Sequence, residues 1–219
     1  MMPKRVIILA NGSLREPDSL RRRVQAWSDA TVVAADGGLQ HAEVLGLQAQ
    51  ALVGDLDSLP AGTQAQMEAS GVQVIRAETH KDATDLELAL QYAASQGALE
   101  IALVGAWGAR LDMSVANLLL LLSPTLSSLR VEIWDADQTA WVMRPPGGQI
   151  PGKAGDTLSL IPLSEQARGI HTTALAYPLA GETLTAGAAR GVSNVLTGPL
   201  AEVHFESGAL LVVHTPGRA

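Results

Sequence analysis

Short apolar runs recur along the first 137 residues, and longer segments of mixed polarity separate them. Each run holds three to five mostly β-branched or aliphatic residues, which is typical of a buried β-strand. Strands that alternate with helices form βαβ units, so the pattern predicts a mainly parallel sheet. The six predicted strands span residues 6–10, 32–35, 51–53, 72–75, 101–104 and 131–134.

Helical spacing is clearest after the fourth run. Apolar residues recur there at i, i+3, i+4 and i+7, at Leu86, Ala89, Leu90 and Ala93. Thr84 and Glu87 fit a capping box at the start of this helix. The other predicted helices are residues 17–30 and segments that begin near Leu39, Pro60 and Leu111.

The pattern changes after Trp141. Glycine and proline punctuate short apolar segments such as 157–161, 201–205 and 209–213, and no helical stretch separates them. Turn signals at this spacing predict an antiparallel β-sandwich. We therefore expect a Rossmann-like α/β domain over residues 1–137, followed by an all-β domain over residues 138–219.

Composition and charge exclude several classes of function. The chain has no cysteine, which excludes disulfides, thiolate metal sites and cysteine nucleophiles. Residues 138–219 hold equal numbers of basic and acidic residues, so the net charge of −7 lies in the first 137 residues. An acidic domain in a chain with 3% aromatic residues lacks the surface that binds nucleic acid. A polyanionic ligand would need a cation between itself and the protein.

Neither of the apolar runs that could suggest a membrane segment is long enough for one. The first run, Val6–Ala10, is shorter than a signal-peptide core, and Leu118–Leu122 is far below the ~20 residues of a membrane-spanning helix. We expect a cytoplasmic protein without a membrane partner.

Two pairs of aspartates follow predicted strands. Asp55 and Asp57 follow the third strand, and Asp82 and Asp85 precede the helix after the fourth. The first pair would point the same way in an extended segment, and the second would share a face at the start of a helix. Four carboxylates at the edge where α/β sheets bind ligands favour Mg²⁺ together with substrate phosphates. Helix capping by either pair, or by the neighbouring Ser and Thr, is the open alternative.

Two loops with glycine lie at the same predicted edge. In the loop after the fifth strand, Arg110 can bind a phosphate with two hydrogen bonds, and Asp112 can accept one from an amine or ring N–H. Lys81, beside the second aspartate pair, can neutralise a phosphate. Asp36 and a following Gly-Gly come after the second strand. Ordinary strand-to-helix turns, and a solvated lysine, are the alternatives.

Several motifs of other enzyme classes are absent. The chain has no serine-hydrolase elbow or Walker P-loop, and it lacks the first Gly-x-Gly of a dinucleotide fingerprint. His41 and His80 lack a metal-binding spacing, and Mg²⁺ prefers oxygen ligands. Asp-x-Asp after a strand also occurs in haloacid-dehalogenase-type enzymes and glycosyltransferases. In the former the nucleophilic Asp usually follows the first strand, where this chain has Asn11 and Gly12. Another Mg²⁺-dependent phosphotransferase or phosphatase is the enzyme alternative.

Taken in order, the motifs of this chain resemble those of the thiamine pyrophosphokinase family. They are Ala35–Gly38, Gly54–Ser58, Lys81–Glu87, Gly105–Asp112 with Asn117, Gly191–Asn194 and Gly208–Val213. The resemblance implies a nucleotide-handling α/β domain followed by a β-sandwich. It also implies a homodimer whose thiamine site lies where the subunits meet. The hydroxyl of thiamine would attack the β-phosphorus of ATP, giving thiamine pyrophosphate and AMP.

The resemblance further implies a role for each matching residue. The Mg²⁺ ligands would be Asp55, Asp57 and Asp85. The residues serving the phosphates would be Lys81, Asp82 and Arg110. Asp112 would meet the aminopyrimidine of thiamine. Ser193 and Asn194 would close the thiamine site from the second domain. The nucleotide-binding set is completed by Asp36, Gly37 and Thr84.

Two positions depart from the family pattern. The family usually reads Gly-Gly-Arg before Asp112 and His after it, whereas this chain has Ala109 and Met113. Ala109 narrows the backbone angles open to the loop, and Met113 removes a hydrogen-bond donor. For stacking on the thiamine rings, the tail offers Phe205 and its histidines. A module that binds thiamine or nucleotide without turnover is the non-enzyme alternative.

Overall fold

Two compact units make up the chain, Met1–Ala136 and Asp137–Ala219. The computed structural model describes residues 4–57, 59–60, 62–77 and 82–217. Within these residues, no helix is both long enough and apolar enough to cross a bilayer.

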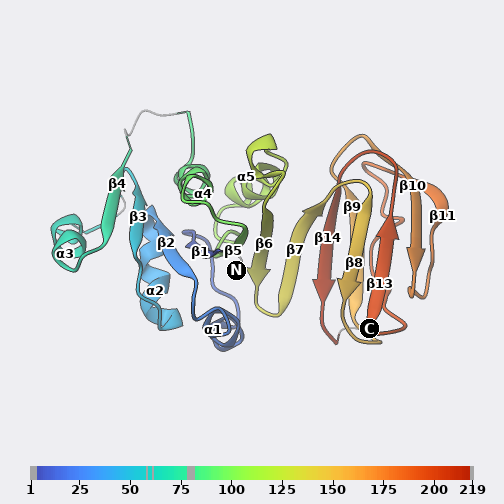
Figure 1. Cartoon of the computed structure of the whole chain (residues 1–219), viewed down its shortest axis with the longest axis horizontal. Helices are drawn as coiled ribbons and strands as arrows, with labels where there is room; N and C mark the ends of the chain where they lie inside the picture. Colours follow the sequence, from blue (N-terminus) through green and yellow to red (C-terminus); the bar gives the residue numbers. More distant parts are fainter. Residues whose placement is uncertain (1–3, 58, 61, 78–81, 218–219) are drawn as a thin grey trace. The chain divides into compact units, whose positions relative to one another are not determined.

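The first unit is built on a parallel sheet (Figure 1). Its strands hydrogen-bond in the order β6-β5-β1-β2-β3-β4, and each of these neighbouring pairs is parallel. The six predicted strands are confirmed to within one residue at each end. They are β1 (Arg5–Leu9), β2 (Thr31–Ala35), β3 (Ala51–Gly54), β4 (Gln73–Arg76), β5 (Glu100–Val104) and β6 (Arg130–Asp135).

Helices connect these strands. Buried side chains of α1 and α2, such as Leu20 and Leu45, pack with Ile7 and Leu9 of β1 in one apolar core. Helix α4 buries its predicted apolar face and contacts β1, β2 and β3. The helices are α1 (Pro17–Gln25), α2 (Gln40–Leu45), α3 (Thr63–Ala69), α4 (Asp85–Ser95) and α5 (Leu111–Leu120), with short 3₁₀ helices η1 (Asp36–Leu39) and η2 (Pro124–Leu126).

The end of α1 differs from the sequence prediction. The helix stops at Gln25 instead of continuing to residue 30, and turns follow it. Trp27 then packs edge-to-face on Trp134 with ring centroids 4.8 Å apart. The guanidinium of Arg23 lies 4.4 Å from the centre of the Trp134 ring. Arg23 of α1 therefore packs against β6.

The second unit contains antiparallel strands in two groups, as predicted. One group has the order β12-β9-β14-β7 and the other β11-β10-β13-β8. The strands are β7 (Gln138–Met143), β8 (Gly147–Pro151), β9 (Thr157–Pro162), β10 (Gln166–Thr173), β11 (Ala180–Thr185), β12 (Asn194–Val195), β13 (Leu200–His204) and β14 (Leu210–Thr215).

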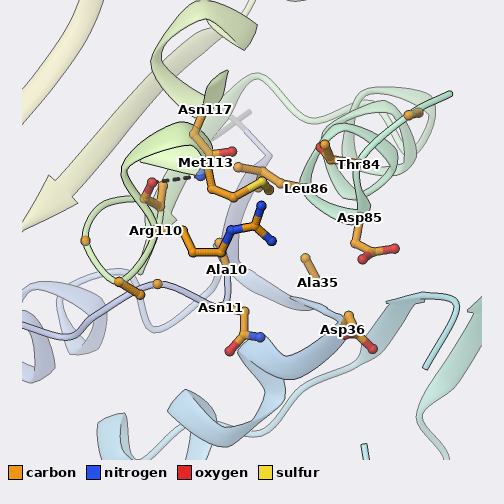
Figure 2. Close-up of a pocket in the computed structure, with 15 residues that line it drawn as sticks. Ala10, Asn11, Ala35, Asp36, Thr84, Asp85, Leu86, Arg110, Met113 and Asn117 are labelled. Atoms are coloured by element: carbon orange, nitrogen blue, oxygen red, sulfur yellow. Dashed lines mark hydrogen bonds between the residues drawn. The ribbon is translucent and has the colours of Figure 1, made fainter. Parts of the chain in front are cut away.

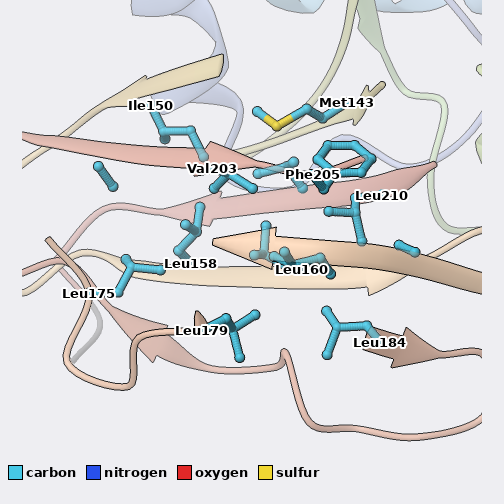
Figure 3. Close-up of a cluster of buried hydrophobic side chains, with 14 of the residues drawn as sticks. Met143, Ile150, Leu158, Leu160, Leu175, Leu179, Leu184, Val203, Phe205 and Leu210 are labelled. Carbon is cyan, nitrogen blue, oxygen red and sulfur yellow. The ribbon is translucent and has the colours of Figure 1, made fainter. Parts of the chain in front are cut away.

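Alternating side chains of the two groups form the core of the second unit (Figure 3). Leu158 and Leu160 of β9 meet Val203 of β13 and Leu210 of β14 there. Phe205 is buried in this core, with 4% of its surface exposed. Phe205 therefore has no ring face to offer thiamine in this structure, which leaves the histidines among the stacking candidates named from the sequence.

Candidate functional site

A cavity of about 390 Å³ lies at the carboxyl edge of the parallel sheet. The chain leaves β1 and β5 towards opposite ends of the sheet, so a crevice opens where these strands end. The segments lining the cavity follow β1, β2 and β5 or begin α4 and α5 (Figure 2). Four predicted site residues line it: Asp36, Thr84, Asp85 and Arg110.

Close backbone packing joins the loops after β1 and β5. The amide of Gly12 donates to the carbonyl of Gly105 over 2.7 Å, and the amide of Ser13 donates to that of Trp107 over 2.9 Å. A Cβ on Gly12 would lie 2.3 Å from the Gly105 oxygen, so only glycine fits there. His41 is buried with its Nε2 2.8 Å from the Gly12 carbonyl, and burial lowers the pKa of His41.

Gly37 packs against a residue of the cavity wall. A Cβ at this position would lie 2.4 Å from Nδ2 of Asn11, which itself lines the cavity. Gly37 is not among the lining residues in the described part of the chain. Its place is therefore in the packing of η1 against the loop after β1.

Three carboxylates converge beside the cavity. One oxygen from each of Asp36, Asp55 and Asp57 lies within 4.8 Å of the other two. Leu56 has a left-handed φ of 65°, and the Asp57 amide donates to Oδ1 of Asp55 over 3.3 Å. A tight turn therefore brings Asp55 and Asp57 together, which corrects the expectation of an extended segment. The third member is Asp36 rather than the predicted Asp85.

The negative charges of these three carboxylates repel one another. The charge of Asp55 is the largest of the effects that raise the pKa of Asp57, and Asp36 and Asp85 add to it. Asp85 lies close by, because its Oδ1 would be 3.2 Å from a Cβ on Gly54. Converging carboxylate oxygens are a donor set that suits a hard divalent cation.

Helix α4 presents its first turn to the cavity. The side chain of Thr84 accepts a hydrogen bond from the amide of Glu87 over 3.2 Å, which confirms Thr84 as the cap. The helix begins at Asp85, so Asp82 lies outside it, exposed and without the shared helical face that was expected. Lys81 falls outside the described residues.

The loop before α5 carries Arg110 and Asp112. Arg110 donates to both carboxylate oxygens of Asp112, over 3.1 and 2.5 Å, and this pairing lowers the pKa of Asp112. Both side chains are exposed, and Asp112 is not among the described residues that line the cavity. Ala109, where the family usually has glycine, has a left-handed φ of 61°.

Two buried polar residues of α5 hold this loop. Ser114 Oγ accepts from the Gly108 amide over 3.0 Å and donates to the Arg110 carbonyl over 2.8 Å. Asn117 Nδ2 donates to the Ala106 carbonyl over 2.8 Å. These contacts, and the place of Asn11 in the cavity wall, were not predicted, although Asn117 belongs to the fourth motif.

Ser193 and Asn194 lie in the second unit. Ser193 is exposed with a φ of 59°, and its amide donates to Ser159 Oγ over 3.0 Å. Asn194 is buried, and its amide group bonds to both the N–H and the C=O of Tyr177, over 3.0 and 2.7 Å. Tyr177 is 63% exposed, so Asn194 anchors the backbone of an accessible aromatic residue that was not predicted from the sequence.

Two family models match the chain. The model described as "Thiamin pyrophosphokinase, catalytic domain" matches residues 24–133. The model described as "Thiamin pyrophosphokinase, vitamin B1 binding domain" matches residues 149–210. The first match includes the carboxylate trio and Arg110, and the second includes Tyr177, Ser193 and Asn194.

Individual proteins are similar over most of their length. The thiamine pyrophosphokinase of Bacillus subtilis (strain 168) is 27% identical over 187 residues, covering 84% of this chain and 83% of that protein. A crystal structure of thiamine pyrophosphokinase from Bacillus subtilis has a TM-score of 0.85 at 24% identity, over 97% of this chain and 99% of that one. A crystal structure of thiamin pyrophosphokinase from Geobacillus thermodenitrificans has a TM-score of 0.81 at 28% identity, over 96% and 97%.

Proposed function

Because this chain belongs to the thiamin pyrophosphokinase family, we propose that it transfers the pyrophosphoryl group of ATP to the hydroxyl of thiamine, giving thiamine pyrophosphate and AMP. The observation that carries this proposal is the position of Asp36. Asp36 belongs both to the carboxylate trio and to the cavity wall. A cation held by the trio would border the space open to a phosphorylated substrate.

Mg²⁺ is the cation that this site would hold. Asp36, Asp55 and Asp57 offer oxygen ligands, and Mg²⁺ typically leaves positions for water and substrate phosphate. Asp85, a ligand expected from the resemblance, lies outside the trio, but its charge also raises the pKa of Asp57, and we keep it as a proposed ligand. When bound, Mg²⁺ would neutralise the charge of the transferring phosphates.

Arg110 would bind the phosphates. Its present partner, Asp112, is exposed, and exposed ion pairs contribute little to stability because water screens them. A phosphate can therefore replace Asp112 on the guanidinium, which leaves Asp112 to accept a hydrogen bond from thiamine. Transfer of this kind needs positioning and charge neutralisation rather than a covalent nucleophile. Lys81 and Asp82 remain predicted phosphate residues.

The second unit would contribute to the thiamine site. Tyr177 presents an exposed ring, and the Asn194 side chain fixes the backbone that carries this ring. An aromatic ring of this kind suits stacking on the flat rings of thiamine. We propose that Asn194 acts through Tyr177, that Ser193 lies beside the substrate, and that the active form is a cytoplasmic homodimer.

A single assay separates this function from its alternatives. The protein is incubated with thiamine, ATP and Mg²⁺, and AMP and thiamine pyrophosphate are measured. The proposal expects both products in equal amounts, dependent on thiamine. Release of orthophosphate without thiamine would instead indicate a phosphatase. Thermal stabilisation by the ligands without any product would indicate a binding module.

A further inference from the structure

Asn117 carries a buried hydrogen-bond acceptor that has no protein partner. The residue is 6% exposed, and its Nδ2 donates to the Ala106 carbonyl over 2.8 Å. A carbonyl can only accept, so this bond fixes which end of the amide faces Ala106. The Oδ1 atom is therefore turned away from that carbonyl, and within the described residues it has no hydrogen-bond partner.

Apolar side chains share the cavity wall with Asn117. Leu86 of α4 and Met113 of α5 line the same cavity (Figure 2). Small side chains such as Ala106 and Ala10 form other parts of the wall. A buried acceptor among apolar groups costs stability unless a donor reaches it, and here that donor can come from a bound molecule.

The chemistry around Asn117 Oδ1 restricts which group of a bound molecule can donate a hydrogen bond to it. Phosphate oxygens are acceptors and would be repelled by Oδ1, so the charged end of a substrate is excluded from it. The apolar side chains of Leu86 and Met113 suit a flat ring whose edge carries an N–H group. A ring with a carbonyl in place of the N–H group would bring two hydrogen-bond acceptors, its own oxygen and Oδ1, against each other and would bind poorly.

We propose that Asn117 Oδ1 accepts a hydrogen bond from the exocyclic amino group of an aminopyrimidine ring, and so selects the substrate. The proposal rests on the proposed function, because adenine in ATP and the pyrimidine of thiamine both carry such a group. Asn117 is thus a specificity-determining residue for one of these two rings. Its bond to Ala106 fixes the orientation of the amide that carries the acceptor.

The test compares each substrate with an analogue that lacks the amino group. The pairs are ATP with purine riboside triphosphate, and thiamine with its 4′-deamino analogue. For one pair, the wild-type enzyme should prefer the amino form in kcat/KM by roughly tenfold, the worth of one buried hydrogen bond. Asn117→Ala should remove that preference by weakening only the amino form. The pair that loses its preference identifies the ring.

Ser114→Ala is the matched control. Ser114 holds the same loop through Gly108 and Arg110, and its hydroxyl already has partners. This variant should weaken both members of each pair together and leave their ratio unchanged. A purely structural role for Asn117 would give the same result in Asn117→Ala, and that outcome would overturn the proposal.

Three further results would contradict the proposal. A wild-type enzyme that turns over both amino and deamino forms equally in both pairs contradicts the proposal, even if Asn117→Ala fails to fold. Loss of the preference for ATP over 2′-deoxy-ATP in Asn117→Ala would assign the acceptor to a ribose hydroxyl, and would also contradict it. A wild-type protein that binds neither ATP nor thiamine overturns the proposed function, and this inference with it.

Discussion

At the scale of single residues, the negative charge of Asp57 is unfavourable in the folded protein, and the same charge is proposed to bind Mg²⁺. The folded protein raises its pKa, so the charged carboxylate is less favourable there than in the unfolded chain. Asp57→Asn removes that charge. We expect the variant to melt at a higher temperature than wild type in EDTA, and to lose the stabilisation that Mg²⁺ gives the wild-type protein.

Thermal melts of both proteins with and without Mg²⁺ check this prediction. Glu68→Gln on α3 is the control, because it removes one exposed negative charge outside the trio. It should leave the Mg²⁺ response intact. An Asp57→Asn protein that Mg²⁺ still stabilises as strongly as wild type would exclude Asp57 as a ligand.

His41 predicts a dependence of stability on pH. Burial lowers its pKa below the ordinary value of 6.5, so the folded state binds fewer protons than the unfolded state near that pH. The stability contributed by the neutral ring is present above pH 6.5 and is lost as the pH falls below it. The slope from this one group is at most ~1.4 kcal/mol per pH unit.

Urea unfolding between pH 7.5 and 5.5 measures this slope. In His41→Gln, whose amide can donate to the Gly12 carbonyl in place of Nε2, the slope should fall below that of wild type. His204→Gln, a change at an exposed histidine, should retain the wild-type slope. Equal slopes in all three proteins would rule out titration of His41.

At the scale of elements, regular structure could be predicted far better than the turns of the site. Strand periodicity and the Thr84 capping box are local signals, so β1 to β6 and the start of α4 followed from the sequence. The turn at Leu56 could not be predicted, because its left-handed φ of 65° is unusual for a branched side chain. Tertiary packing holds such residues in place, and sequence spacing does not report it.

Ala109 gives a prediction about the loop before α5. Its φ of 61° strains an alanine but not a glycine, and its side chain is exposed, so little packing is lost on substitution. Ala109→Gly should raise the free energy of unfolding by about 0.5 kcal/mol, after allowing for the greater freedom of glycine in the unfolded chain.

Ala65→Gly is the matched comparison for this loop. Ala65 is exposed within α3, where glycine should lower the free energy of unfolding by about 1 kcal/mol. Urea unfolding of the two variants should therefore give changes of opposite sign. Destabilisation by Ala109→Gly would show that the loop gains more from the alanine methyl than it loses in strain.

At the scale of the whole molecule, the site depends on which strands are neighbours. Asn11 and Asn117 are far apart in the sequence, yet both line one cavity because β1 and β5 are adjacent. The motifs located the loops, but membership of the carboxylate trio depended on the three-dimensional position of Asp36. Asn11 and Asn117 are single uncharged residues, which give no comparable signal in the sequence. Their place in the cavity wall was therefore not predicted.

Exposed apolar residues on α5 provide a test of the proposed homodimer. Leu111, Val115 and Leu119 recur every four residues, and 77%, 46% and 50% of their surfaces are exposed. They form an apolar stripe on one face of the helix, which a second copy of the chain would cover. Val115→Glu would place a charge in that contact.

We expect light scattering to give twice the mass of one chain for the wild-type protein and the mass of a single chain for Val115→Glu. Formation of thiamine pyrophosphate should fall at least ~10-fold in the variant, since a buried unpaired charge costs several kcal/mol of association. ATP binding should persist, because the cavity lies within one chain. Val44→Glu places the same charge at a 42% exposed valine on α2 and should remain dimeric. A dimeric Val115→Glu protein would place the subunit contact elsewhere, and a monomeric wild-type enzyme with full activity would refute the dimer.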